Sequence, residues 1–125
     1  MIKFATMILL LALSFGAHAA RNPGESAQEC VDVSKGAAGK VTFSNSCGEK
    51  IFVIYCGDLK YSKQRCGNGP KGGFYTHSAN LAPGQSNDVA FDGRFSYAAC
   101  KGAISFGNDG EYIDNPSGGI QCLRR

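Results

Sequence analysis

The sequence predicts an all-β domain: a small disulfide-stapled β-sandwich or barrel of about eight to nine short antiparallel strands. Three observations lead to this prediction. Glycine-rich turn segments recur every eight to twelve residues. The runs between them alternate apolar and polar side chains, which is typical of strands with one buried face. Six cysteines in a short chain fit a small exported domain that is cross-linked because its core is small.

The first nineteen residues have the features of a secretory signal peptide. Lys3 provides the positive start, an apolar run follows from Phe4 to Phe15, and Ala17 and Ala19 form an A-x-A cleavage site. The run is shorter than the ~20 residues of a transmembrane helix, and no second run of that kind follows. We therefore expect a secreted or periplasmic protein, with residues 1–19 as the signal peptide and residues 20–125 as one soluble, monomeric domain without a transmembrane segment.

The cysteines are predicted to form structural disulfides. Their spacing contains no C-x-x-C pair, which argues against a thioredoxin-type redox pair or a zinc knuckle. The mature chain has one histidine, which leaves few ligands for a mixed cysteine and histidine metal site. We expect no metal and no cofactor. Three disulfides would each stabilise the domain by roughly 2–4 kcal/mol. Fifteen connectivities are possible; we favour Cys56 with Cys66 across a basic loop, then Cys47 with Cys100 and Cys30 with Cys122.

The first strands in chain order are expected at 40–45 and 51–55. A turn at 47–50 would join them into the clearest hairpin of the sequence. Before them, Ser26–Glu29 has room for one helical turn at most. The run 51–55 is apolar on both faces, which predicts a central strand covered on both sides. One cover would be the main core, and the other the loop closed by Cys56 and Cys66 or a binding partner.

Further strands follow the turn signals downstream. Strand 74–78 follows the glycine-rich segment 67–73, and Pro83-Gly84 predicts a turn. Residues 88–91 and 94–100 are expected as two strands joined by a tight turn at Asp92-Gly93. Another hairpin is expected to join 103–106 to 111–113, and the turn 115–119 leads to a last strand ending near Leu123.

Two stretches resemble thaumatin-like proteins, over residues 41–56 and 81–100. Phe43-Ser-Asn-Ser-Cys47, with Ile51 four residues later, is similar to their opening strand pair, and Leu81-Ala-Pro-Gly-Gln-Ser86, followed by Gly93-Arg94 and Cys100, to their next stretch. The order N-x-C, Y-C, L-x-P-G and A-A-C-x-G also resembles small exported bacterial proteins of unassigned activity. The resemblance implies a disulfide-bonded β-sandwich and carries over no site residue.

A basic, aromatic-bearing segment is the first candidate for binding. Lys60, Lys63, Arg65 and Lys71 lie within twelve positions around Tyr61, with Asp58 as the only acid nearby. Such a segment either keeps the protein soluble or meets phosphate, anionic lipopolysaccharide or an acidic protein face. The mature net charge of +2 is too small to predict a nucleic acid partner. Tyrosines at loop or strand ends add contact area. The candidate binding residues are Tyr61, Lys63, Arg65, Lys71 and Tyr75, with Tyr112 as a further exposed tyrosine.

Catalysis would depend on His77. Its neighbour Ser78 points to the other face of a strand, and no G-x-S-x-G occurs. His77, Arg94 and Glu111 could form a nuclease-like set. We expect a non-enzymatic binding protein, a class that includes inhibitors and immunity proteins, whose partner is an extracellular or envelope protein or glycan. The alternative is a small secreted hydrolase or nuclease using His77.

Overall fold

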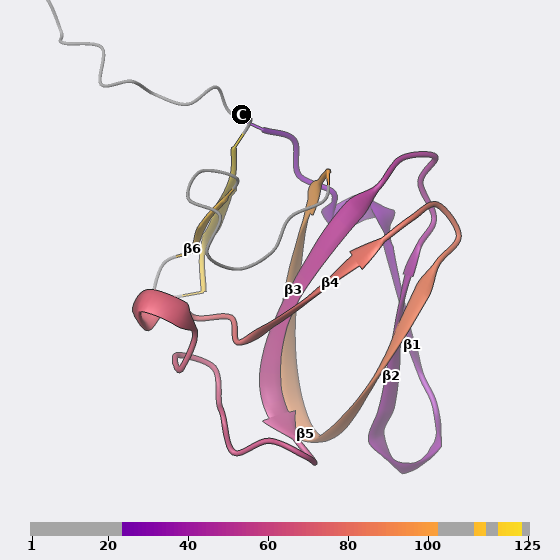
Figure 1. Ribbon diagram of the computed structural model, residues 1–125. Helices are drawn as coiled ribbons and strands as arrows, with labels where there is room; N and C mark the ends of the chain where they lie inside the picture. The colour runs from indigo at the N-terminus through magenta and orange to yellow at the C-terminus, as the bar shows by residue number, and fades with distance from the viewer. Residues whose placement is uncertain (1–23, 103–111, 115–117, 124–125) are drawn as a thin grey trace, which may run out of the picture.

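The computed structural model describes residues 24–102, 112–114 and 118–123, and within these ranges the chain is all-β. A five-stranded antiparallel sheet has the order β1-β2-β5-β3-β4, and β6 and β7 form a separate antiparallel pair (Figure 1). The strands are β1 Val31–Lys35, β2 Lys40–Asn45, β3 Ile51–Leu59, β4 His77–Leu81, β5 Ser86–Lys101, β6 Tyr112–Asp114 and β7 Ile120–Cys122. Short 3-10 turns lie at Gln28–Cys30 (η1), Ala37–Gly39 (η2) and Pro70–Gly72 (η3).

The all-β prediction is confirmed, but its details need correction. The described residues contain seven strands rather than eight or nine. Within those residues β1 and β4 are the two edges of the large sheet, so the sheet does not close into a barrel. No helix long and apolar enough to cross a membrane occurs in the described ranges. The predicted signal peptide and the predicted hairpin through 103–111 lie outside them.

Strand β5 gives the sheet its shape. Its first part pairs with β2, and its second part pairs with β3 as far as Lys101. Between the two parts Phe91 lies opposite Leu59 and Phe95 opposite Gly57, so three residues of β5 bulge against one of β3. A bulge of this kind bends a strand without ending it. The predicted tight turn at Asp92-Gly93 is therefore wrong, and the two strands expected there are one bent strand.

The main core lies between the two halves of this folded sheet. Val41 and Phe43 of β2 belong to the same buried cluster as Val53 and Tyr55 of β3. The Phe43 ring lies 5.6 Å from the Tyr55 ring between centroids. Burying apolar side chains from both halves holds the bend closed, since each buried large side chain contributes about 1.5–3 kcal/mol.

Strand β3 is buried on both faces, as its apolar run predicts. Its second face packs into a separate cluster that holds Phe52, Ile54 and Cys56, together with Tyr75 and Cys122. The cover on this face comes from the segment that precedes β4 and from the β6–β7 pair (Figure 1). The prediction of a central, doubly covered strand is confirmed, while the contribution of β6 and β7 to the cover was not foreseen.

The disulfides join Cys30 to Cys47, Cys56 to Cys66, and Cys100 to Cys122. The prediction for Cys56 and Cys66 is confirmed, and the other two pairings are wrong. The hairpin expected between 40–45 and 51–55 is also wrong, because β2 pairs with β1 and β5, and β3 pairs with β4 and β5.

Instead, the chain crosses from one half of the sheet to the other between β2 and β3. Cys47 lies at the start of this crossing, where the Ser46 N–H donates to the Cys30 carbonyl over 2.9 Å. Cys100, near the end of β5, faces the second cluster, where it meets Cys122. Cys47 therefore pairs with Cys30, and Cys100 pairs with Cys122.

The remaining predicted elements are close to those observed. Strand β4 begins at His77 rather than at residue 74. The turn at Pro83-Gly84 is confirmed by a hydrogen bond of 2.9 Å from the Gln85 N–H to the Ala82 carbonyl and by a φ of +76° at Gly84. The predicted last strand is β7, which ends at Cys122.

Candidate binding surface

The segment Gly57–Arg65, which we call the basic loop, begins within β3 and is closed at its base by the disulfide between Cys56 and Cys66. Cys56 is fully buried in the second cluster, and the two Cα atoms are 5.0 Å apart. The Lys60 N–H donates to the Ala90 carbonyl over 3.1 Å, which pins the loop to β5. Both ends of the basic loop are therefore fixed on the sheet.

Arg65 organises the inside of the loop. Its Nη1 donates to the Ser62 carbonyl over 2.8 Å and to the Gln64 carbonyl over 3.1 Å. Its Nε lies 3.4 Å from Asp58 Oδ1, and its backbone N–H donates to Asn68 Oδ1 over 2.8 Å. About half of the Arg65 side chain remains exposed. We conclude that these contacts of Arg65 hold the conformation of the loop.

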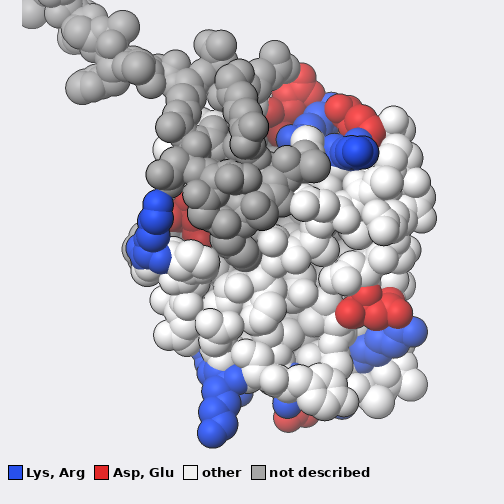
Figure 2. Space-filling model, in the orientation of Figure 1, with Lys and Arg blue, Asp and Glu red and all other residues white. Residues whose placement is uncertain are grey.

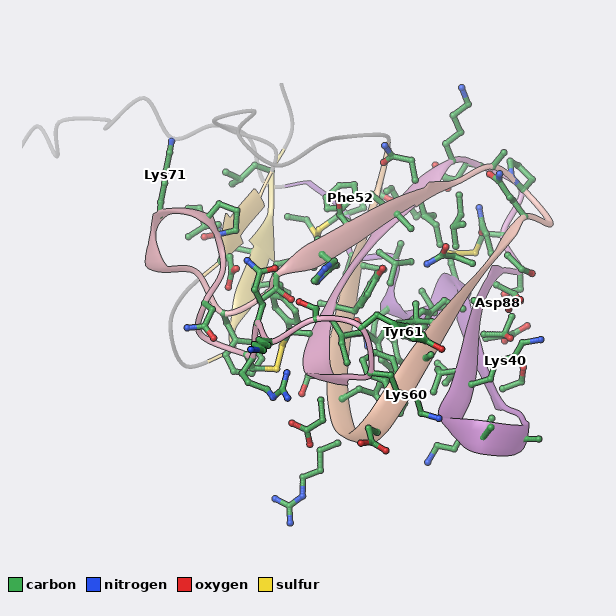
Figure 3. All side chains as sticks on the ribbon, turned by 60° about the horizontal axis from the view of Figure 1, so that its bottom comes forward. Lys40, Phe52, Lys60, Tyr61, Lys71 and Asp88 are labelled. Atoms are coloured by element: carbon green, nitrogen blue, oxygen red, sulfur yellow. A yellow bond between two sulfur atoms is a disulfide. The ribbon has the colours of Figure 1, made fainter. Side chains whose placement is uncertain are left out.

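Tyr61 projects from this ordered loop. Its side chain is 91% exposed, and the only other large hydrophobic residue exposed within the described ranges is Ile113, at 51%. Figure 3 shows Tyr61 beside Lys60, with Lys40 and Asp88 on the neighbouring strands of the same end. Exposed tyrosines on rigid supports are typical of contact surfaces, because the ring offers apolar area and the hydroxyl offers a hydrogen bond.

Two open pockets adjoin at this end of the molecule. The loop pocket, of about 530 Å³, lies against Asp58, Tyr61, Lys63 and Arg65. The turn pocket, of about 440 Å³, lies against Lys35, Lys40, Phe91 and Phe95. Lys60 and Asp92 line both pockets, so the two share a common border.

The turn pocket depends on the tight connection between β1 and β2. Ala38 and Gly39 both have positive φ, of +58° and +75°. A side chain at Gly39 would overlap the Phe91 carbonyl, so glycine permits the turn to approach β5. Lys60 Nζ donates to the Ala38 carbonyl over 2.5 Å and so ties the basic loop to this turn.

Positive charge is concentrated around the two pockets. They are lined by five cations and two carboxylates, a net charge of +3, whereas the predicted mature chain has +2 in total. Lys40 Nζ lies 3.5 Å from Asp88 Oδ2, and the hydrogen bond from the Thr42 hydroxyl, with Lys40 as a smaller contribution, lowers the pKa of Asp88. Figure 2 shows basic side chains projecting at the lower end of the molecule. The five lining cations are Lys35, Lys40, Lys60, Lys63 and Arg65.

Two of the predicted binding residues lie elsewhere. Lys71 is on η3, well separated from Tyr61 in Figure 3. Tyr75 is only 4% exposed, and its hydroxyl donates to the Gly118 carbonyl over 3.1 Å. Burial, with a smaller contribution from Asp114, raises the pKa of Tyr75. The expectation that Tyr75 is accessible is wrong, because it packs under the β6–β7 pair. The side chain of Tyr112 lies outside the described residues.

The structure does not bring His77 and Arg94 together. His77 is on β4, stacked on the Tyr55 ring at 5.6 Å, and its Nδ1 shares a hydrogen bond of 2.7 Å with the Thr76 hydroxyl. Arg94 is in the bulge of β5, on the other side of β3. The backbones of His77 and Arg94 are thus separated by two strand spacings, or roughly 10 Å. Glu111 lies outside the described residues, and no cluster of three metal-ligating side chains occurs within them.

The lysines of the turn pocket were missed as site residues. Lys35 and Lys40 flank Gly36-Ala-Ala-Gly39, and this symmetrical K-G-A-A-G-K pattern is visible in the sequence. It predicts a tight turn with two cations at its base. The sequence does not show that the bend of β5 places this turn beside the basic loop, which begins eighteen residues later in the chain.

No protein-family model, no curated protein and no solved structure matches the chain. The resemblance to thaumatin-like proteins therefore stays a prediction.

Proposed function

We propose that this protein is a secreted or periplasmic, non-enzymatic binding protein that contacts a macromolecular partner through the basic loop. The partner is an extracellular or envelope protein or glycan, and proteins that inhibit or neutralise another protein belong to this class. We also infer that the two halves of the folded sheet act as the two layers of a small β-sandwich that supports the loop.

The observation that carries the proposal is the exposure of Tyr61 on a loop that is otherwise tied down. A disulfide, a main-chain bond to β5 and the contacts of Arg65 fix the loop around a side chain that is 91% exposed. Binding to a preordered loop loses little conformational entropy, since the ordering is completed during folding. An exposed aromatic residue at such a position is typical of an interface anchor.

The cross-links support the proposed location. Three disulfides in a chain of this size indicate an oxidising compartment. The predicted signal peptide gives a route to that compartment.

The proposal is tested by capturing partners from envelope and culture-medium extracts of the producing cell with the mature, oxidised protein. Three baits are compared: the unchanged protein, Tyr61→Ala, and Ile113→Ala as a matched control at the other large exposed hydrophobic side chain. We expect a partner that the unchanged protein and Ile113→Ala retain and Tyr61→Ala loses. A partner retained equally by all three baits would place the binding surface elsewhere.

A further inference from the structure

The two adjoining pockets share part of their lining, and together we call them the groove. They share Lys60 and Asp92 at their border, and both are open to solvent. We propose that this groove binds an oligosaccharide that carries acidic groups, such as sulfates, phosphates or carboxylates. The inference rests on the proposed function and names the chemistry of the ligand.

Lysine side chains line each pocket and their common border, so an acidic chain lying along the groove would meet several positive charges. Lys35 lies at one side of the turn pocket, 5.7 Å from the centroid of the Phe95 ring. Lys60 stands at the border, held by its bond to Ala38, and Lys63 lines the loop pocket. Lysine is a compact point charge without the planar fork of arginine, so it suits single anionic oxygens at several positions.

The acids near the groove reduce this charge only in part. Asp58 is engaged by the Arg94 N–H at 3.1 Å and by Arg65 at 3.4 Å. Asp88 is engaged by Thr42 and Lys40. Asp92 remains at the border, beside Lys60. Because the two engaged carboxylates already have partners, Lys35, Lys60 and Lys63 supply most of the attraction for an incoming anion.

The lining favours a saccharide over an acidic protein or a single-stranded nucleic acid. The core of a protein interface is depleted in charged residues, whereas seven of the sixteen residues that line the two pockets are charged. Proteins that bind single strands stack successive bases on several aromatic residues. Within the described ranges Tyr61 is the one aromatic side chain that is largely exposed. A single exposed ring with spaced cations matches one sugar face and the acidic groups of a flexible chain.

The test uses a fluorescein-labelled heparin hexasaccharide and measures anisotropy with the mature, oxidised protein at two salt concentrations. Two double variants remove the same charge: Lys35→Gln with Lys60→Gln in the groove, and Lys50→Gln with Lys71→Gln as the control. Lys50 precedes β3 and Lys60 follows it, and the two ends of β3 are roughly 25 Å apart, so Lys50 lies far from the groove. Thermal unfolding verifies that both variants fold.

We expect the groove variant to bind the hexasaccharide about tenfold more weakly, the effect of losing two surface ion pairs with a multiply charged ligand, while the control changes less than about twofold. Binding should weaken with salt, because exposed charges are screened. Equal weakening by both variants would overturn the inference, since it would show attraction to net charge alone. No binding at the lower salt, or tighter binding of an oligothymidylate or an oligoglutamate of equal charge, would also overturn it.

Failure of this inference can be told apart from failure of the proposed function. Loss of hexasaccharide binding alone, with capture still dependent on Tyr61, removes only the acidic saccharide as ligand. Capture that does not depend on Tyr61 removes the basic loop as the partner-binding surface.

Discussion

Replacing Asn45 by alanine should strongly destabilise the fold, because this side chain holds the crossing between the two halves of the sheet. Asn45 ends β2 and is 2% exposed. Its Nδ2 donates to the Leu81 carbonyl over 3.1 Å and to the Glu49 carbonyl over 2.7 Å, and its Oδ1 accepts from the Cys47 N–H at 2.9 Å. These bonds join β2, the crossing and β4.

The size of the effect follows from the burial of each partner. The bond to the Leu81 carbonyl is buried, so its loss leaves an unsatisfied acceptor that costs about 1–3 kcal/mol. The other two bonds are part-buried, and water can replace the side chain there, at about 0.5–1 kcal/mol each. We expect Asn45→Ala to lower the free energy of unfolding by about 2–5 kcal/mol.

Urea unfolding of the oxidised protein measures this change. Asn68→Ala is the control, because Asn68 is an exposed asparagine with a single described side-chain bond, to the Arg65 N–H at 2.8 Å; its loss should cost no more than about 1 kcal/mol. Asn45→Asp should also be destabilised at neutral pH, since a carboxylate oxygen would then face two carbonyls. An unfolding free energy for Asn45→Ala within about 0.5 kcal/mol of the unchanged protein would refute the reasoning.

Three further predictions concern the loop, the strand beneath it and one surface carboxylate. Replacing both Cys56 and Cys66 by alanine should lower the free energy of unfolding by about 2.5–3 kcal/mol, as for a closed loop of ten residues, and speed amide exchange in the basic loop; unchanged exchange would show that the disulfide does not order it. Ile54→Ala, at a fully buried position, should cost about 2–5 kcal/mol in urea unfolding, and a loss below about 1 kcal/mol would contradict tight packing of the second cluster. The lowered pKa of Asp88 means that its stabilising contribution is present above the ordinary aspartate pKa and is lost as pH falls through the lowered value. Thr42→Val should therefore raise the pKa of Asp88 in a carbon-13 NMR titration, and an unmoved titration would show that the hydroxyl is not the main cause.

Local features of the fold could be predicted from the sequence, because they depend on neighbouring residues. The apolar run from Ile51 indicated a strand buried on both faces. Pro83-Gly84 indicated the turn that joins β4 to β5. The pairing of Cys56 with Cys66 followed from the polar loop between them. In each case the pattern and its structural cause lie within about a dozen residues.

Long-range pairing could not be predicted, because the sequence does not show where a strand bends. Asp92-Gly93 has the composition of a hairpin turn, yet the Asp58 carboxylate accepts the Arg94 N–H and lies close to Gly93, and the strand continues. That bend separates β2 from β3, and the wrong pairings of Cys47 and Cys30 follow from it. The bend also brings Lys35 and Lys40 to the same pocket as Lys60. The basic loop could therefore be predicted from its own sequence, whereas the groove, which depends on the bend, could not.

The dissociation constant of the captured partner, measured by calorimetry for three proteins, tests the role of the basic loop most directly. The proteins are the unchanged mature chain, Tyr61→Ala and Ile113→Ala. If Tyr61 anchors the interface, its removal weakens binding at least about tenfold, while Ile113→Ala changes it less than about twofold. Equal dissociation constants for the unchanged protein and Tyr61→Ala would contradict a binding surface centred on this loop.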